Sequence, residues 1–472
     1  MTELLHLPWH EARAQTSERE LVEASINAID ALNPKLNAFL HVARDAGDGM
    51  PLAVKDNIVT TGMPTTCASR ILGKFVSPFD ATAISRARAA GCSIVGKTNL
   101  DEFAMGSSTE HSAFGTARNP WDTTRVPGGS SGGSAVAVAA RMVPAALGSE
   151  TGGSVRQPAA LCGVVGLKPT YGRVSRNGLV AFGSSVDQIG IVTKTVRECA
   201  EVLGMIAGHD PLDSTSSANP VDDYAVDLDA GVRGLRFGVV REAVGQLEGE
   251  VRANFDDALR VLRAGGAVIE EVSVPTIGYA IAIYYIVANA EASANLSRFD
   301  GIRYGHRSDR AKTLREVYFE SRGEGFGDEV KRRIMLGTFA LSSGYYDAYY
   351  GQAQAVRAKL RADFDAAFAR FDYLLTPTTP EPAFPIGAKT DDPLAMYLSD
   401  IFTAPANLVG IPAIAVPSGF SHEHLPLSLQ IMAPQFSERA LFRAASFFER
   451  ETGYWRELPP GCDGALASSP AG

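Results

Sequence analysis

Two serines at the ends of Gly-Gly-Ser units are the residues of this sequence best suited to nucleophilic chemistry. Ser130 lies in the run PGGSSGGS, and Ser154 lies in GSETGGSVRQPA, 24 positions further on. Glycines beside a serine keep bulky side chains away from its hydroxyl and from the neighbouring backbone N–H groups. The segment is therefore a candidate for covalent catalysis at a serine hydroxyl. A tightly packed stretch with several turns is the simpler interpretation of the same glycines.

Neither a phosphate-binding loop nor a histidine triad explains these turns. No Gly-Lys-Ser or Gly-Lys-Thr follows either serine, and the glycine spacing of a dinucleotide-binding loop is absent. No histidine lies between His111 and His209, so the segment itself supplies no imidazole base. A nucleophilic serine here would need a base other than histidine.

Lys55 is the candidate for that base. It follows the apolar run 51–54 and precedes Asp56 and Asn57, in a strand that we expect to point into a sheet. An apolar environment penalises the ammonium form of lysine, which leaves the nitrogen free to accept a proton. An ion pair between Lys55 and Asp56, or with a surface carboxylate, is the simpler interpretation.

Taken together, these residues resemble the amidase signature family. The runs AVKDN with Lys55, GGSSGGS with Ser130 and GSETGGSVRQPA with Ser154 match its motifs, and the spacings of 75 and 24 positions agree with it. The resemblance implies a triad of lysine, cis serine and serine. In that triad Ser154 is the acyl-forming nucleophile, Ser130 is the bridging cis serine and Lys55 is the base.

The turn before Ser154 offers a place for the developing negative charge of a tetrahedral intermediate. Thr151, Gly152 and Gly153 bring successive backbone N–H groups into one turn without a bulky side chain over them. Such a turn is suited to an oxyanion hole. A plain turn is the simpler interpretation, and it is compatible with the catalytic one.

Three further stretches, residues 284–305, 329–350 and 391–420, resemble one branch of the family, the A subunits of aminoacyl-tRNA amidotransferases. This branch resemblance implies a glutaminase that supplies ammonia to convert Glu-tRNA(Gln), Asp-tRNA(Asn) or both to the amidated form. It implies a heterotrimer with a B subunit, which binds tRNA and uses ATP and Mg²⁺, and a small C subunit. No cofactor and no metal are expected in this chain itself.

Free glutamine carries an α-carboxylate and an α-ammonium, so its pocket needs a cation and an anion near the nucleophile. The branch resemblance implies Arg333 for the carboxylate and Asp400 for the ammonium, with Tyr284 or Tyr285 as a wall or hydroxyl. Arg332 is an alternative to its neighbour Arg333. A solvated helix face for the Lys-Arg-Arg run and a helix cap at Asp400 are the simpler interpretations.

Two other functions fit parts of the same pattern. A stand-alone amidase would act on a small amide and would lack the glutamine-specific pair and the partner surface. A non-catalytic scaffold subunit would hold a complex together with a degenerate site, but the intact Lys55, Ser130 and Ser154 argue against it. Co-purification with two further subunits would separate the glutaminase subunit from the stand-alone enzyme.

The elements that must position these residues follow an α/β order. Ser17 and Glu20 form a capping-box pattern that opens a helix, and Asn33-Pro34 is expected to end it. The strand 51–59, the helix 82–91 and the strand 92–99 follow in the α/β manner. Further predicted elements are the strands 236–240, 267–274, 373–378 and 413–420 and the helices 250–264 and 348–370.

The expected fold is a single α/β domain with a large mixed twisted sheet, helices on both faces and short insertions. Its parts are an N-terminal helical segment, a signature core with the triad, the remainder of the sheet with the substrate pocket, and a loosely held tail. These parts span residues 1–50, 51–200, 201–455 and 456–472.

Composition sets the limits on partners and location. The 472 residues include 44 Lys and Arg against 53 Asp and Glu, a net charge of −9, so no global positive field attracts a nucleic acid. Any tRNA is therefore expected to bind mainly through the B subunit. The five scattered cysteines indicate buried thiols, and the charged N-terminus lacks a secretory signal. We expect a cytoplasmic protein without a membrane segment.

Overall fold

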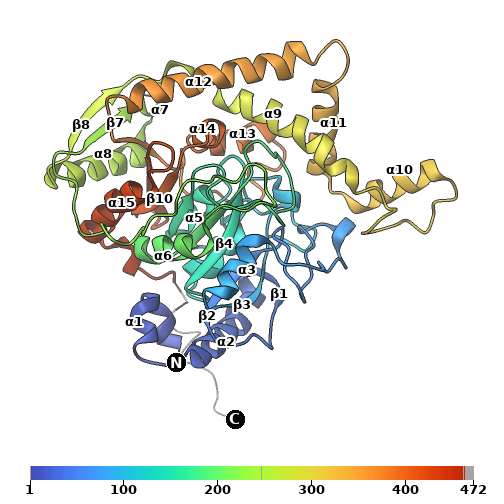
Figure 1. Cartoon of the computed structure of the whole chain (residues 1–472), viewed down its shortest axis with the longest axis horizontal. Helices are drawn as coiled ribbons and strands as arrows, with labels where there is room; N and C mark the ends of the chain where they lie inside the picture. Colours follow the sequence, from blue (N-terminus) through green and yellow to red (C-terminus); the bar gives the residue numbers. More distant parts are fainter. Residues whose placement is uncertain (1, 246, 461, 463–472) are drawn as a thin grey trace.

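The structure, a computed structural model, describes residues 2–245, 247–460 and 462. Within these ranges eleven strands form one sheet in the order β1-β3-β2-β4-β6-β5-β10-β11-β9-β7-β8 (Figure 1). The strands are β1 (Phe39–Val42), β2 (Met50–Lys55), β3 (Cys92–Thr98), β4 (Ala145–Glu150), β5 (Val165–Lys168), β6 (Gln188–Thr193), β7 (Arg236–Val240), β8 (Val268–Val272), β9 (Tyr373–Pro377), β10 (Ala413–Phe420) and β11 (Pro426–Met432).

The sheet is mixed, as expected from the sequence. β2 lies between β3 and β4 and is parallel to both, and β7 is parallel to both β8 and β9. The remaining neighbours are antiparallel. All residues of β2, β3, β4, β5 and β6 are buried, so side chains on both faces of this part of the sheet are covered.

Helices cover both faces of the sheet. The helices α3 (Thr82–Ala89), α6 (Val196–Ile206), α15 (Glu438–Thr452) and α8 (Gly249–Ala264) contact one another in this order and form a row over one face (Figure 1). The short helices α4 (Gly132–Ala139) and α5 (Arg156–Cys162) pack together against the central strands. Lys55 points toward them, because it is paired with Thr98 in β3, whose Oγ1 lies 2.7 Å from Ser134 Oγ in α4.

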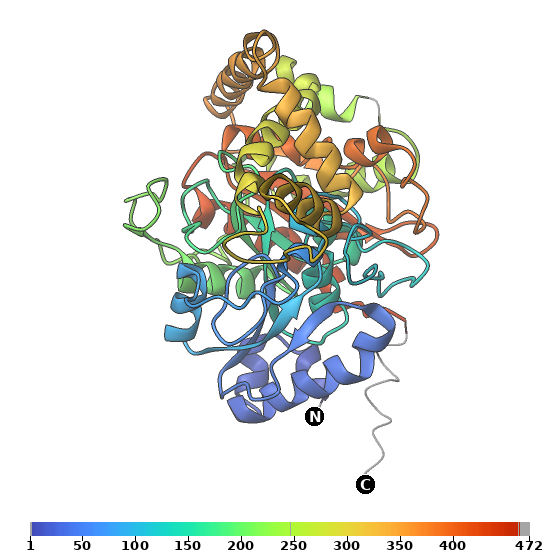
Figure 2. The ribbon, with the colours of Figure 1, turned by 90° about the vertical axis from the view of Figure 1, so that its right-hand side faces the viewer.

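Between β8 and β9 the chain forms a helical excursion that is much larger than the short insertions expected from the sequence. It contains α9 (Ala280–Asn295), α10 (Leu314–Gly325), α11 (Asp328–Ala340) and α12 (Gln352–Phe368). These helices, yellow to orange in Figures 1 and 2, lie at the end of the molecule opposite α1 (Trp9–Arg13) and α2 (Glu18–Leu36). α9 packs against both α11 and α12.

Several expected elements differ in their ends. The capping box at Ser17 is present, but α2 continues through Pro34 to Leu36, although proline has no N–H to donate to the carbonyl oxygen of Asp30. Asn37 then ends the helix in the left-handed conformation, with φ of 49°. Of the expected tail 456–472, residues 461 and 463–472 lie outside the described residues. The remaining helices are α7 (Arg241–Val244), α13 (Pro393–Tyr397) and α14 (Ala404–Val409).

Candidate active site

Lys55 and Ser130 are in direct contact in the structure. Lys55 is the last residue of β2, and its Nζ lies 2.7 Å from Ser130 Oγ and 3.1 Å from the carbonyl oxygen of Ser149. Ser130 lies just before α4, and the peptide bond between Gly129 and Ser130 is cis. The two candidate residues, 75 positions apart in the chain, thus share one hydrogen bond.

The environment of Lys55 favours its neutral form. Its side chain is completely buried, and this burial lowers its pKa to about 7, although the charges of Asp101, Glu150 and Asp187 oppose the shift. Asp56 does not pair with Lys55, because its Oδ1 lies 3.2 Å from Lys97 Nζ. The alternative interpretation, an ion pair between Lys55 and Asp56, is therefore wrong. Near neutral pH a substantial fraction of Lys55 can accept a proton.

Ser154 lies in the turn that joins β4 to α5, next to the loop of Ser130. The backbone N–H of Ser131 donates to the carbonyl oxygen of Ser154 at 2.9 Å, which ties the two serine loops together. Lys55 and Ser130 are 0% exposed, whereas Ser154 is 6% exposed. The three candidate triad residues therefore come from three separate segments that meet beside α4 and α5.

The turn before Ser154 has free donors and closely packed walls. No described residue accepts a hydrogen bond from the backbone N–H groups of Gly152, Gly153 or Ser154. A Cβ added at Gly152 would lie 2.6 Å from Cζ of Tyr284, so the ring covers this glycine. Thr151 holds the start of the turn, with its Oγ1 donating to Asp187 Oδ1 at 2.8 Å. These free N–H groups can stabilise a developing oxyanion.

Asp400, at the end of the 3₁₀ turn η7 (Leu398–Asp400), lies next to the same turn. Its Oδ2 accepts a hydrogen bond from Ser107 Oγ at 2.5 Å, whereas its buried Oδ1 has no hydrogen-bond partner in the described structure. A Cβ at Gly153 would lie 2.8 Å from this Oδ1. Burial raises the pKa of Asp400 to about 7. Asp400 therefore presents an unpaired carboxylate oxygen directly beside the turn of the candidate nucleophile.

The structure distinguishes Arg333 from Arg332. Arg333 is buried on the inner face of α11, where its Nε donates to Glu329 Oε1 at 2.7 Å. The side chain of Arg332 is 44% exposed. The guanidinium of Arg333 lies 5.1 Å from the ring centroid of Tyr285 and 5.3 Å from that of Tyr397. Arg333, and not Arg332, therefore faces the interior.

The two tyrosines have different positions. Tyr284 is buried against Gly152, and its ring meets that of Tyr285 edge-on, with centroids 4.9 Å apart. Tyr285 stacks on Tyr397 with centroids 3.7 Å apart. Tyr284 is thus the wall next to the turn of Ser154, and Tyr285 connects that wall to Arg333.

A buried ion pair behind the Ser154 turn was not predicted from the sequence. Glu150 and Arg156 are both 0% exposed, and Glu150 Oε2 accepts from the backbone N–H groups of Val155 and Arg156 at 3.0 Å each. The guanidinium of Arg156 also donates to Thr403 O at 2.8 Å and to Asn407 Oδ1 at 2.6 Å, and it contacts Gln430. Residues 126–169 contain only four charged residues, and this scarcity is the signal that could have singled out the pair.

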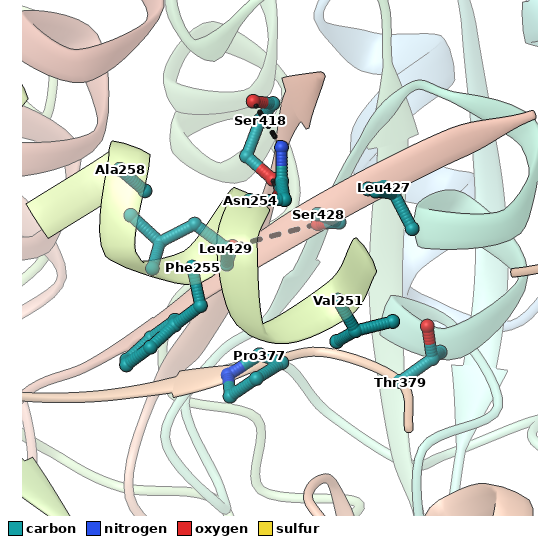
Figure 3. A pocket seen from close by; sticks show the side chains of 10 residues that line it. All are labelled: Val251, Asn254, Phe255, Ala258, Pro377, Thr379, Ser418, Leu427, Ser428 and Leu429. Carbon is teal, nitrogen blue, oxygen red and sulfur yellow. Dashed lines mark hydrogen bonds between the residues drawn. The ribbon is translucent and has the colours of Figure 1, made fainter. Parts of the chain in front are cut away.

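A pocket away from the candidate site has an uncharged lining. Figure 3 shows a pocket between α8 and the strands β9–β11, lined by residues such as Phe255, Leu427 and Leu429 and by the hydrogen-bonded Asn254 and Ser418, with no acidic or basic side chain. Over the described ranges, no three His, Cys, Asp or Glu side chains are grouped to hold a metal ion. No helix in the described part of the chain is long and apolar enough to cross a membrane.

The chain is similar to known proteins over most of its length. A model of the amidase family matches residues 48–442. The A subunit of the Glutamyl-tRNA(Gln) amidotransferase of Shouchella clausii (strain KSM-K16) is 54% identical over 95% of this chain and 96% of that protein. The crystal structure of the corresponding A subunit from Thermotoga maritima is 47% identical, with a TM-score of 0.82, over 97% of this chain and 96% of that one. The native peptide amidase from Stenotrophomonas maltophilia is 30% identical, with a TM-score of 0.81, over 96% of both chains.

Proposed function

This chain belongs to the amidase family, and from that membership and the geometry of its site we propose that it is the glutaminase subunit of a tRNA-dependent amidotransferase. It hydrolyses glutamine through an acyl-enzyme at Ser154. The ammonia converts Glu-tRNA(Gln), Asp-tRNA(Asn) or both to the amidated form. The high identity to relatives named as A subunits of Glutamyl-tRNA(Gln) amidotransferases supports this assignment over nearly the whole chain.

The proposed reaction uses the contact between Lys55 and Ser130. Neutral Lys55 accepts a proton from Ser130, and Ser130 accepts one from Ser154 as the oxygen of Ser154 attacks the carboxamide carbon of glutamine. The free N–H groups of the 152–154 turn stabilise the resulting oxyanion. The carbon–nitrogen bond then breaks, and the proton returns through Ser130 to the leaving nitrogen, which departs as ammonia. Water hydrolyses the remaining ester to glutamate and restores the serine.

The observation that carries the choice of glutamine is the unpaired Oδ1 of Asp400 beside Gly153. A buried carboxylate oxygen without a donor is suited to a substrate that brings its own cation, such as the α-ammonium of glutamine. Arg333, held by Glu329 and the tyrosine rings, supplies the opposite charge for the α-carboxylate. A simple aliphatic amide would leave both charged groups unused.

The proposed partners are a B subunit, which binds tRNA and uses ATP with Mg²⁺, and a small C subunit, in a cytoplasmic heterotrimer. The net charge of −9 supports delivery of tRNA by a partner. The outer side of α11 and the turn after it expose apolar side chains, namely Met335, Leu336, Phe339, Tyr345 and Tyr346. An exposed apolar face of this kind is suited to a subunit interface, and it lies on the helix that carries Arg333.

The other two functions receive less support. The peptide amidase from Stenotrophomonas maltophilia is 30% identical to this chain, whereas the A subunit from Shouchella clausii is 54% identical. A non-catalytic scaffold has no need of a buried lysine in contact with a serine, next to a turn with free backbone donors.

The test compares glutamine with a simple aliphatic amide as substrates of the assembled complex. Asp400→Asn keeps the size of the side chain and removes its charge, so kcat/KM for glutamine should fall by about ten- to a hundredfold, as for the loss of about 1.5 to 3 kcal/mol. The aliphatic amide should lose little, because it never contacts Asp400. Asp45→Asn, at an exposed aspartate far from the apolar face of α11, is the matched control, and the melting temperature reports any folding defect.

Equal losses on the two substrates would mean that Asp400 serves the fold or the triad. They would also remove the main argument for glutamine over a generic amide.

A further inference from the structure

Residues 101–109, here called the 101–109 segment, link the loop of Ser130 to the substrate pocket. The backbone N–H of Asp101 donates to Ser130 O at 3.3 Å. The carboxylate of Asp101 accepts from the backbone N–H groups of Thr109 at 2.8 Å and of His111 at 3.1 Å, which folds the segment back on itself. Asp101 therefore attaches the segment to Ser130 through its backbone and holds the far end of the segment through its carboxylate.

Ser107 is the point where this segment reaches Asp400. Its hydroxyl donates to Asp400 Oδ2 at 2.5 Å across 293 positions of sequence. Its carbonyl oxygen accepts from Gln157 Nε2 at 2.9 Å, and Gln157 Oε1 accepts from the N–H of Gly129 at 2.9 Å. One glutamine thus fixes both Ser107 and the residue before Ser130.

The two oxygens of Asp400 therefore differ. Oδ2 is occupied by the Ser107 hydroxyl, while Oδ1 has no described partner and faces the turn of Gly153. A carboxylate that rotated freely could turn either oxygen to a ligand, whereas one held at Oδ2 can offer only Oδ1. The arrangement orients the carboxylate before the substrate arrives.

We infer that Ser107 is a positioning residue for substrate selection: its hydroxyl holds Oδ2 of Asp400 and so directs Oδ1 to the α-ammonium of glutamine. The inference rests on the proposed function and adds to it a residue that never touches the substrate. Ser107 acts through Asp400, and it has no part in the chemistry at Ser154.

The same hydrogen bond also affects the charge of Asp400. The Ser107 hydroxyl opposes the effect of burial on the pKa of Asp400, as do the charges of Arg333 in α11 and Arg156 in α5. Glu150, at the end of β4, acts in the other direction, and the charge of Asp400 in turn raises the pKa of Tyr284 and Tyr285 of α9. Without the hydroxyl, the pKa of Asp400 should rise, and less of it would be ionised at neutral pH.

The test is Ser107→Ala, with Ser108→Ala as the matched control. Both serines are buried and adjacent, but the Ser108 hydroxyl has no hydrogen-bond partner in the described structure. Rates of ammonia release by the assembled complex are measured for glutamine and for an aliphatic amide from about pH 6 to about pH 8, which spans the pKa of about 7 of Asp400.

Ser107→Ala should raise KM for glutamine at pH 7 by about tenfold or more, with a smaller effect at higher pH and kcat little changed. The midpoint of the pH profile of kcat/KM should move upward, the aliphatic amide should be unaffected, and Ser107→Thr, which retains a hydroxyl, should recover part of the loss. Ser108→Ala should change neither substrate.

An equal loss on both substrates, or an unmoved pH profile, would overturn the inference. If Asp400→Asn loses glutamine turnover while Ser107→Ala does not, the inference fails and the proposed function stands. If the unaltered complex does not hydrolyse glutamine, the proposed function itself fails.

Discussion

We expect kcat/KM for glutamine to depend unusually steeply on pH, because Lys55 and Asp400 must both lose a proton. Lys55 has to be neutral to act as a base, and burial lowers its pKa to about 7. Asp400 has to be ionised to bind the α-ammonium, and burial raises its pKa to about 7. Both working forms are therefore populated above pH 7 and are lost together as the pH falls through 7.

The size of the effect follows from the two protonation equilibria. A single group with a pKa of about 7 changes its working fraction by about tenfold between pH 8 and pH 6. Two independent groups multiply, so kcat/KM for glutamine should fall by about a hundredfold over this interval, with a limiting slope that approaches two. An uncharged aliphatic amide depends on Lys55 alone and should lose only about tenfold.

The assay is the initial rate of ammonia release under kcat/KM conditions, which report the free enzyme. Asp400→Asn, assayed with glutamine, provides an internal check, because it removes one of the two titrations and should reduce the slope to that of the aliphatic amide. Identical slopes for the two substrates with the unaltered complex would refute the assignment of Asp400 to the ammonium. A flat profile for both would refute a neutral lysine as the base.

Four further substitutions test other parts of the site. Ser154→Ala should abolish glutamine-dependent amidation but leave ammonia-dependent amidation by the assembled complex intact; substantial glutaminase turnover would contradict the nucleophile. Lys55→Arg should be as inactive in kcat as Lys55→Ala, because a guanidinium stays protonated and cannot be a base. Gly152→Ala places a Cβ 2.6 Å from Cζ of the buried Tyr284 and should lower kcat by about tenfold or more as the oxyanion donors shift, together with a lower melting temperature because the ring has to move. Glu150→Gln leaves the buried Arg156 without a charged partner and should lower the free energy of unfolding by about 3 kcal/mol in urea titrations, a loss that would be absent if the pair were dispensable.

The sequence predicted strands well where β-branched residues were concentrated. The runs 236–240 and 413–420 coincide with β7 and β10. β4 was not predicted, because its residues Ala145–Glu150 are mostly small and carry little strand propensity. Small residues are needed there, since a Cβ at Gly148 would lie 2.8 Å from Val155 Cγ2 and 2.9 Å from Ser131 Oγ. Close packing against α4 and α5 thus requires small residues in β4, and these residues lack the strand propensity from which a strand is predicted.

The candidate site was predictable where residues lie within long motifs. Lys55, Ser130 and Ser154 each stand in such a motif, and the structure brings their three segments together. The partners of the pocket residues were not predictable in this way. The choice between Arg332 and Arg333 depends on the rotation of α11, and the hydrogen bond between Ser107 and Asp400 depends on how distant segments fold together.

The ion pair behind the Ser154 turn also has a consequence for the order in which the site is completed during synthesis. The acceptors of Arg156 at Thr403, Asn407 and Gln430 are translated 247 to 274 residues after it. A nascent chain therefore contains Lys55, Ser130 and Ser154 before these acceptors are present to support the turn of Ser154. A chain that ends before residue 400 contains Ser154 but lacks both Asp400 and these acceptors of Arg156.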